Sequence, residues 1–253
     1  MKIHILQSAL FATCLVLSSS LVSAADTKKA HWGYEGHEGP AHWGDLAEEY
    51  VTCKTGKSQS PINITGSKPA QLADIKFSYE PSALDIVNNG HTIQVNYAAG
   101  SSLDVGGKKY KLLQFHFHSP SEHTVDGKPY DMVAHLVHQA DDGQLGVIGI
   151  LMKKGKANPV IDSIWSQLPK HAGDHKQADT KINVTELLPA KHTYYNYSGS
   201  LTTPPCSEGV NWMVMQTPVE VSAEQIATFT NIFSTSVRPV QALHERSIHV
   251  SKD

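Results

Sequence analysis

The stretch QFHFHSPSEHTVDGKPYDMVAHLVH, residues 114–138, is unusually rich in histidine. Its histidines are His116, His118, His123, His135 and His138. The apolar run at its start predicts a β-strand, and side chains two residues apart in a strand lie on the same face of the sheet. His116 and His118 therefore share one face, and Phe115 and Phe117 share the other. The chemistry of the stretch depends on which further histidine joins that pair.

A second strand is predicted at 132–140, where MVAHLVHQA is almost continuously apolar. His135 and His138 are three residues apart, so they lie on opposite faces of this strand. If the two strands are neighbours, one of these histidines meets the His-x-His pair. A His-x-His pair with one distant histidine is the ligand set of a catalytic zinc site, in which water takes the fourth position. The pair alone is equally consistent with a half-exposed polar face of the sheet.

The rest of the chain is dominated by strand patterns separated by NNG, AAG and GG turns. These patterns predict strands at 75–79, 83–87, 92–97, 102–107, 111–118, 132–140, 146–154 and 210–219. Helices are predicted at 158–168 and 222–233, the second with Ser222 as N-cap and Gln225 three residues later. No internal repeat or low-complexity linker divides the chain. The sequence predicts one β-dominated domain with peripheral helices.

The N-terminus has the features of a signal peptide. Lys2 precedes an apolar run, 3–17, and Val22-Ser23-Ala24 forms a small-x-small cleavage pattern. That run is too short to span a bilayer, and no later run is long enough, so we expect no membrane span. We expect residues 1–24 to be removed and residues 25–253 to form an exported domain, periplasmic or secreted. The chain has 21 basic and 24 acidic residues, and its basic residues form no cluster in the sequence. This argues against a nucleic-acid partner.

Two cysteines, Cys53 and Cys206, remain after removal of the signal peptide. In an oxidising compartment an even pair predicts a disulfide bond. The alternative is two unpaired buried thiols.

Four blocks of the sequence resemble the α-class carbonic anhydrases. The blocks are HWGYEGHEGPAHW (31–43), QSPINI with NNGHTIQV (59–64 and 88–95), the histidine-rich stretch, and YSGSLTTPPCSEGVNW (197–212). They follow the family's order and extend the resemblance from about residue 31 to about residue 241. The resemblance implies a mainly β (α+β) single domain around a twisted, mostly antiparallel central sheet, with short peripheral helices. It also matches Cys53 and Cys206 to the disulfide of exported members.

The resemblance implies a zinc lyase that reversibly hydrates carbon dioxide to bicarbonate and a proton, by zinc-hydroxide attack and with a histidine proton shuttle. The implied Zn²⁺ ligands are His116, His118 and His135, which leaves His123 and His138 as packed structural residues. Inhibition by sulfonamides is implied as well. The expected partners are small molecules, namely carbon dioxide, bicarbonate and water, and a homodimer is left open.

Further residues take roles from the same resemblance. Thr202 is matched to the residue that accepts a hydrogen bond from the nucleophile and donates one to Glu122. A hydroxyl has only one proton to donate, so donation to Glu122 leaves its lone pairs for the nucleophile. Thr203 lines the substrate position, and His91 matches the proton shuttle. The apolar substrate wall is implied to be Val137, Val147, Leu201, Val210 and Trp212. The residues that hold the connecting waters are implied to be Tyr34, Asn89 and Gln94, the last of which replaces the more common Asn.

One position departs from the family. Metal-binding histidines usually donate their outer N–H to an acceptor, and Gln114 matches that partner for His116. Two residues before His135, where the family usually has Glu, this chain has Val133. The outer N–H of His135 is therefore expected to lack its usual acceptor, which predicts weaker zinc binding.

Two other functions are compatible with the sequence. A catalytically silent, carbonic-anhydrase-like zinc- or ligand-binding domain is the first alternative, although such proteins lose ligands that this chain keeps. An exported esterase that uses the same zinc site is the second, although no dedicated ester pocket is indicated.

Overall fold

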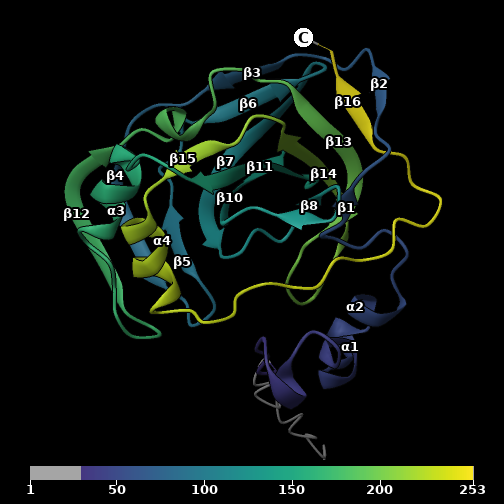
Figure 1. The fold of residues 1–253 in the computed structure, drawn as a ribbon, viewed down its shortest axis with the longest axis horizontal. Helices are drawn as coiled ribbons and strands as arrows, with labels where there is room; N and C mark the ends of the chain where they lie inside the picture. The colour runs from purple at the N-terminus through teal and green to yellow at the C-terminus, as the bar shows by residue number, and fades with distance from the viewer. Residues whose placement is uncertain (1–29, 253) are drawn as a thin grey trace, which may run out of the picture.

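A 13-stranded sheet organises the part of the chain that the computed structural model describes, residues 30–252. Its main path runs β12–β4–β5–β7–β10–β11–β14–β13–β16–β2, with β3, β6 and β15 branching from it (Figure 1). Most neighbouring strands are antiparallel, and the parallel pairs in this sheet are β11 with β14, β11 with β15 and β16 with β2. This is the mainly β, mostly antiparallel fold expected from the sequence. The predicted signal peptide, residues 1–24, lies outside the described residues.

The strands of this sheet are mostly short at its margins and long at its centre. The strands are β2 (Lys68–Ala70), β3 (Ile75–Ser78), β4 (Ser82–Asn88), β5 (Ile93–Asn96), β6 (Ser102–Val105), β7 (Lys108–His118), β10 (Met132–Ala140), β11 (Leu145–Lys154), β12 (His175–Ile182), β13 (Tyr194–Ser200), β14 (Glu208–Met215), β15 (Val219–Val221) and β16 (His249–Ser251). A small separate sheet contains β1 (Asn63–Ile64), β8 (Thr124–Val125) and β9 (Lys128–Pro129).

Short helices lie at the periphery. They are α1 (Trp43–Leu46), α2 (Thr52–Thr55), α3 (Pro159–Trp165) and α4 (Ala223–Thr230), with 3-10 turns at Gly36–Glu38, Glu48–Tyr50 and Val184–Leu187. The predicted capping box of α4 is present, since the Ser222 side chain accepts from the Gln225 backbone and the Gln225 side chain accepts from the Ser222 backbone. Among residues 30–252, no helix has the length and apolarity needed to cross a membrane.

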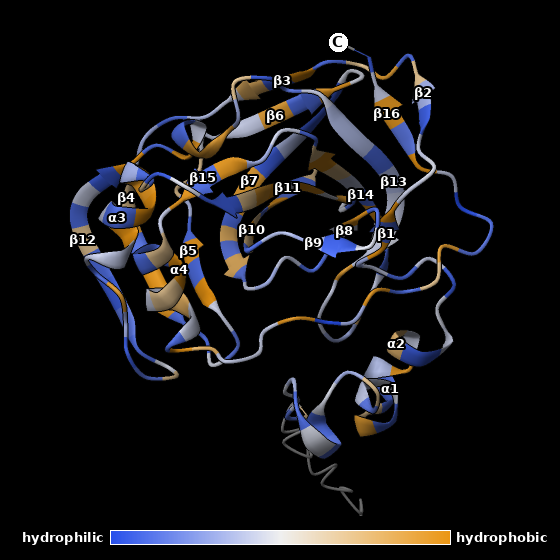
Figure 2. Ribbon diagram, viewed as in Figure 1, coloured by the Kyte–Doolittle hydropathy of each residue, from blue (hydrophilic) through white to orange (hydrophobic). Residues whose placement is uncertain are grey.

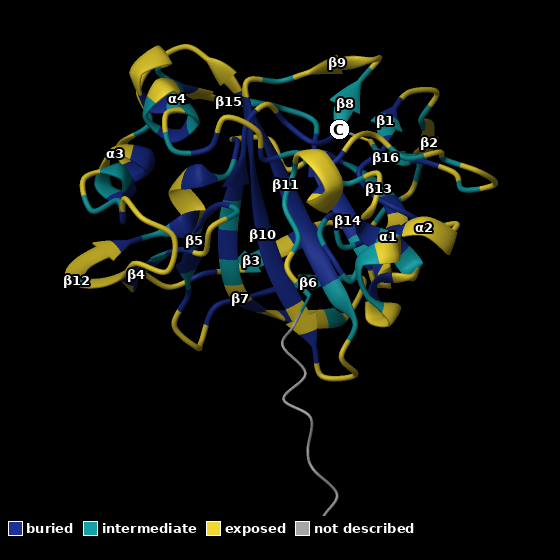
Figure 3. Ribbon diagram, turned by 90° about the horizontal axis from the view of Figure 1, so that it is seen from below, coloured by how far each residue is buried: buried dark blue, intermediate teal, exposed yellow. Residues whose placement is uncertain are grey.

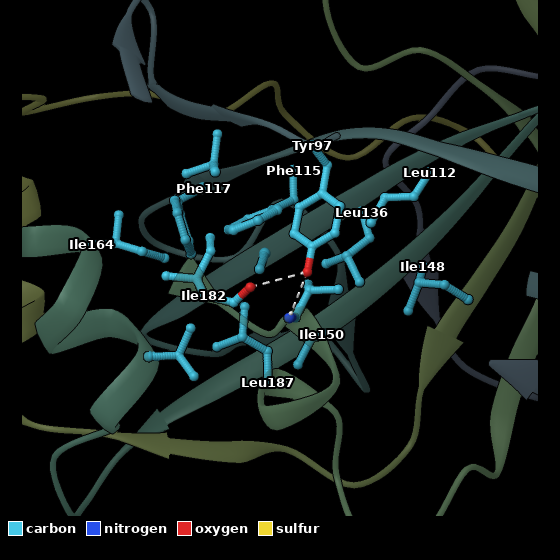
Figure 4. Packing of buried hydrophobic residues seen from close by; sticks show 14 of the residues in the cluster. Tyr97, Leu112, Phe115, Phe117, Leu136, Ile148, Ile150, Ile164, Ile182 and Leu187 are labelled. Atoms are coloured by element: carbon cyan, nitrogen blue, oxygen red, sulfur yellow. Dashed lines mark hydrogen bonds between the residues drawn. The ribbon is translucent and has the colours of Figure 1, made fainter. Parts of the chain in front are cut away.

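The central strands bury both faces, which explains their nearly continuous apolar sequences (Figure 2). One face packs against α3 and α4 in a large cluster that includes Phe117, Ile164 and Phe229. Within this cluster the hydroxyl of Tyr97 donates to the backbone oxygen of Ile182 at 3.2 Å (Figure 4). The helices thus cover the face opposite to the histidine pair.

The other face of β10, β11 and β14 carries a second cluster, which includes Val133, Val137, Val147 and Trp212. In the view of Figure 3 the central strands are buried, whereas β12 at the margin is exposed. The candidate site lies on this face of the sheet, next to the second cluster.

The strand predicted over 210–219 is wrong as a single element. It is divided into β14 and β15, which pair with different parts of β11. Pro218, which lacks a backbone N–H, lies in the break, where a continuous ladder would leave a hydrogen bond unmade.

A disulfide bond joins Cys53 to Cys206 across 153 residues of sequence, the pairing expected from the sequence. Both cysteines pack with Trp43 and Tyr50 in a small third cluster. The bridge attaches the N-terminal segment to the loop that follows β13.

Candidate metal centre

Three histidines meet at the pairing of β7 with β10. In the register of these strands, His135 lies opposite His116, and Val133 lies opposite His118. One ring nitrogen from each of the three histidines lies within 4.8 Å of the other two. The structure therefore brings together the three residues that the resemblance implied as ligands. It places His138 on the opposite face, in contact with Tyr79.

The outer hydrogen bonds show which nitrogen each imidazole offers to a metal. Nδ1 of His116 lies 2.9 Å from Oε1 of Gln114, as the sequence predicted. Nδ1 of His118 bonds the backbone oxygen of Ser236, a partner that the sequence did not indicate because a carbonyl carries no residue signature. These two rings therefore offer Nε2. His135 offers Nδ1 instead, since that atom lies 3.8 Å from Oε2 of Glu122.

The chemistry of this donor set fits a metal ion. Nε2 of His118 is fully buried and has no hydrogen-bond partner among residues 30–252. Burial lowers the pKa of both His116 and His135 well below the usual value for histidine, and the neighbouring His118 adds to the effect. A lowered pKa keeps an imidazole neutral, which is the form that binds metal. Three neutral imidazoles with an open fourth position are the donor set of catalytic zinc sites.

Glu122 lies against this histidine cluster and is fully buried. Its Oε1 accepts from the backbone N–H of Arg238 at 2.9 Å, and its Oε2 lies 3.6 Å from Nε2 of His118. Burial raises the pKa of the Glu122 carboxyl, whereas His118, the Arg238 N–H and the Thr202 hydroxyl each act to lower it. A carboxylate is thus held close to the metal position and close to Thr202.

The loop after β13 carries Thr202 and Thr203. It is closed by hydrogen bonds from the Leu201 backbone N–H to Ser207 at 3.0 Å and from the Cys206 N–H to Thr203 at 2.9 Å. The disulfide at Cys206 fixes the far end of this turn. Thr202 is buried and Thr203 is half-buried at the cavity described below.

The residues implied as an apolar wall lie together. Val137 on β10, Val147 on β11 and Trp212 on β14 occupy one continuous row across the sheet. Val210 belongs to the same cluster, and Leu201 packs against it. Strand parity alone had placed only Val137 on this face, because the register of β11 with β14 is not visible in the sequence.

A cavity of about 120 Å³ opens beside His116 and His118. It is lined by Trp32, Tyr34, Asn89, His91, Thr92, Gln94, Gln114, His116, His118 and Thr203. The candidate proton shuttle, His91, therefore lines the same cavity as two candidate metal ligands, His116 and His118. The three candidate water-holding residues line it too. Nε2 of Gln94 donates to Oδ1 of Asn96 at 2.7 Å, which leaves the Gln94 carbonyl for the cavity.

His91 is half-buried at this cavity. Its imidazole stacks on the indole of Trp32, with ring centroids 3.7 Å apart and 9° between the planes. The side chain of Asn89 accepts from the His91 backbone N–H at 3.0 Å and so orients the turn. Burial, and secondly the charge of His31, lower the pKa of His91. No role was predicted for Trp32.

His123 is packed as the resemblance implied. It is fully buried, and its Nε2 lies 2.6 Å from the hydroxyl of Tyr197. Nε2 of His135 has no hydrogen-bond partner among residues 30–252, and Val133 beside it offers none. The expectation that the outer nitrogen of His135 lacks a protein acceptor is therefore confirmed.

Comparison with known proteins places the chain in a family. A family model described as eukaryotic-type carbonic anhydrase matches residues 38–252. A carbonic anhydrase of Nostoc sp. is 46% identical over 243 residues, which cover 91% of this chain and 90% of that protein. A carbonic anhydrase of Neisseria gonorrhoeae is 44% identical over 241 residues, which cover 94% of this chain and 95% of that protein. The solved α-carbonic anhydrase of Thermovibrio ammonificans, in complex with the inhibitor sulfanilamide, matches with a TM-score of 0.86 at 47% identity, over 88% of this chain and 100% of that one. This chain therefore belongs to the α-class, or eukaryotic-type, carbonic anhydrase family.

Proposed function

We propose that the protein reversibly hydrates carbon dioxide to bicarbonate and a proton, with a zinc ion held by His116, His118 and His135. The observation that carries the proposal is the convergence of three imidazole nitrogens within 4.8 Å beside a buried carboxylate. Membership of the family supports carbon dioxide as the substrate. When bound, zinc lowers the pKa of a coordinated water to about 7, a value characteristic of carbonic anhydrases, and so supplies the nucleophile at neutral pH.

Glu122 and Thr202 orient the attacking group. Oε1 of Glu122 is occupied by the Arg238 N–H, so Oε2 is the oxygen available to the Thr202 hydroxyl. Because a hydroxyl has only one proton, donation to Glu122 turns the lone pairs of Thr202 toward the metal position. The lone pairs of Thr202 accept a hydrogen bond from a group at the metal position. They therefore favour a group that carries a proton there, and they fix its orientation.

The apolar row of Val137, Val147 and Trp212 receives the substrate. Carbon dioxide has no net charge, so an apolar wall binds it without the cost of desolvating a polar group. Leu201 and Val210 complete the wall beside the Thr202 loop, and Thr203 at the cavity is the residue we assign to the bicarbonate position.

His91 carries the product proton to solvent. Its imidazole lies at the same cavity as His116 and His118, and Tyr34, Asn89 and Gln94 provide polar groups that hold waters in between. An imidazole titrates near neutral pH, so it accepts a proton from the cavity and releases it to buffer.

We further propose that the protein is exported and processed after residue 24, so that the functional domain is 25–253. The disulfide between Cys53 and Cys206 supports an oxidising compartment. Binding of sulfanilamide by the Thermovibrio ammonificans relative supports inhibition of this protein by sulfonamides.

One observation favours a second candidate function. The unpartnered Nε2 of His135 is consistent with a domain that binds zinc or another ligand without turnover. The two functions are separated by measuring zinc content and carbon dioxide hydration on the same samples of the wild-type protein and of His118→Ala. We expect about one zinc per wild-type chain with rapid hydration, and loss of both in His118→Ala.

His171 provides the control, because it is exposed and is not one of the three candidate ligands. His171→Ala is expected to change neither zinc content nor the rate of hydration. Wild-type protein that retains zinc and does not hydrate carbon dioxide would favour the silent binding domain.

A further inference from the structure

Two buried imidazole nitrogens beside the third candidate ligand have no hydrogen-bond partner among residues 30–252. They are Nε2 of His135 and Nδ1 of His123. The two ring centroids lie 6.1 Å apart, and both rings pack against Trp212, at 4.7 Å for His123 and 4.9 Å for His135. Buried polar groups are nearly always hydrogen-bonded, so two unpartnered groups in one apolar region call for an explanation.

The position of His135 fixes the state of its outer nitrogen. Its Nδ1 is the atom on the side of Glu122, where the metal ligands converge. A neutral imidazole carries one N–H and one lone pair, and the metal takes the lone pair. Nε2 of His135 therefore carries the hydrogen, and it is a donor without an acceptor.

The state of His123 follows from the hydroxyl chain on its other side. Nε2 of His123 lies 2.6 Å from the Tyr197 hydroxyl, which lies 2.8 Å from Oγ of Ser60. Oγ of Ser60 already accepts from the Ser200 backbone N–H at 3.0 Å. Among residues 30–252, the Tyr197 hydroxyl is the acceptor that remains for the Ser60 proton. The Tyr197 proton must then go to Nε2 of His123, which leaves the hydrogen of the neutral ring on Nδ1.

Both unpartnered nitrogens are therefore donors, and neither satisfies the other. We propose that one buried water molecule beside Val133 accepts a hydrogen bond from Nε2 of His135 and from Nδ1 of His123. Water has two lone pairs, and two N–H···O bonds of ordinary length join nitrogens up to roughly 6 Å apart. The two rings are neighbours, with centroids 6.1 Å apart, so one water oxygen between them is within reach of a ring nitrogen on each side. Buried waters in proteins typically join polar groups of this kind. The inference rests on the proposed zinc site, whose third ligand it describes in more detail.

This water makes His123 a positioning residue for the metal site. It connects His135 through His123 and Tyr197 to Ser60, whose backbone N–H donates to Oγ of Ser200 at 2.9 Å. Ser200 immediately precedes the loop that carries Thr202. The third metal ligand and the proton-ordering loop are thus joined by one hydrogen-bonded chain. A water is a weaker acceptor than a carboxylate, so it holds the ligand less firmly than the Glu usual in the family.

Nitrogen NMR of uniformly labelled, zinc-loaded protein tests the assignment directly. Two-bond couplings from the ring hydrogens identify the protonated nitrogen of each histidine. We expect His123 to be protonated at Nδ1 and His135 at Nε2, with both N–H protons protected from solvent exchange. Protonation of His123 at Nε2 would overturn the inference, because Nδ1 would then be an acceptor. Protein that binds no zinc would overturn the proposed function and this inference together.

Zinc loss to a chelator provides a second test that does not depend on turnover. His123→Gln keeps a polar group near Tyr197 but removes the Nδ1 donor, so the water loses one of its anchors. We expect zinc to leave about 10-fold faster than from the wild-type protein, the lower end of the effect of losing an outer hydrogen-bond partner. His138→Gln is the matched control, since His138 is equally buried but bonds Tyr79 on the opposite face of the sheet. Equal rates for wild type and His123→Gln, or equal acceleration in both variants, would overturn the inference.

Discussion

The imidazole of His91 lies flat on the indole of Trp32, with ring centroids 3.7 Å apart and 9° between the ring planes. Trp32 thus covers one face of the group to which we assign proton release. Burial is the main cause of the lowered His91 pKa, and the charge of His31 is the smaller cause. Trp32→Ala is expected to raise the His91 pKa toward 6.5, because it exposes the ring to water. Titration of the His91 ring protons by NMR measures this shift.

The control for Trp32→Ala is His31→Gln, which removes the lesser cause and leaves the stacking in place. It is expected to raise the His91 pKa by less. An unchanged His91 pKa in Trp32→Ala would show that the stacking does not control the titration.

His91→Ala tests the proton shuttle itself. With the imidazole removed, we expect carbon dioxide hydration at low buffer concentration to slow by about 10-fold or more, since positioned proton-transfer groups have effects of at least that size. Added imidazole is expected to restore much of the rate. The shuttle assignment fails if the variant is as fast as the wild type in dilute buffer, or if imidazole gives no recovery.

Glu122→Gln tests the ordering of the Thr202 proton. A glutamine amide can donate to the Thr202 hydroxyl, which then turns its own proton toward the metal position and repels a proton-bearing group there. We expect kcat/KM to fall by about 10- to 100-fold while zinc content is unchanged. Glu186→Gln, an exposed substitution of the same kind, is expected to have no effect. A fully active Glu122→Gln protein would contradict the role assigned to Glu122.

Val133→Glu supplies a protein acceptor where the outer nitrogen of His135 has none. We expect zinc loss to a chelator to slow by about 10- to 100-fold, the usual effect of an outer hydrogen-bond partner. Val133→Leu adds bulk without an acceptor and is expected to speed zinc loss. If the glutamate variant released zinc at the wild-type rate, the missing acceptor would not limit zinc affinity.

We expect the free energy of unfolding of the metal-free protein to fall in acid, because several of its histidines are buried. Burial lowers the pKa of His123 to about 3 and that of His138 to about 4, against 6.5 for an exposed ring, and it lowers the pKa of His116 and His135 too. Below pH 6.5 the unfolded chain binds more protons than the folded chain, so the free energy of unfolding falls as the pH is lowered from 6.5 toward 4.

Glu122 has the opposite effect on stability in acid, because burial raises the pKa of its carboxyl. It is a single group, whereas four buried histidines destabilise the folded chain as the pH falls. Urea unfolding at pH 7.5, 6 and 4.5, values chosen to bracket this window, measures the trend. Equal stability at all three would contradict the burial of neutral imidazoles.

Much of this fold was predictable because the central strands carry a strong apolar signal. The strands at 111–118, 132–140 and 146–154 are present with nearly the predicted bounds. β12 was missed because it is an exposed edge strand, HKQADTKI, whose polar side chains show no period. Local sequence cannot reveal a strand that is stabilised mainly by its backbone pairing with β4.

The site was predictable where strand parity applies and not where distant segments meet. Parity placed His116 and His118 together, whereas the choice of His135 over His138 needed the resemblance. Trp32 and the backbone oxygen of Ser236 were not predicted, because stacking and carbonyl acceptance arise from tertiary contacts that no local pattern encodes.

Stopped-flow measurement of carbon dioxide hydration from pH 6 to 9, on protein lacking residues 1–24 and with quantified zinc, is the decisive test of zinc-dependent hydration. We expect fast turnover that rises through a single ionisation near pH 7 and disappears when zinc is removed. The absence of turnover above the uncatalysed rate, at one zinc per chain, would contradict it.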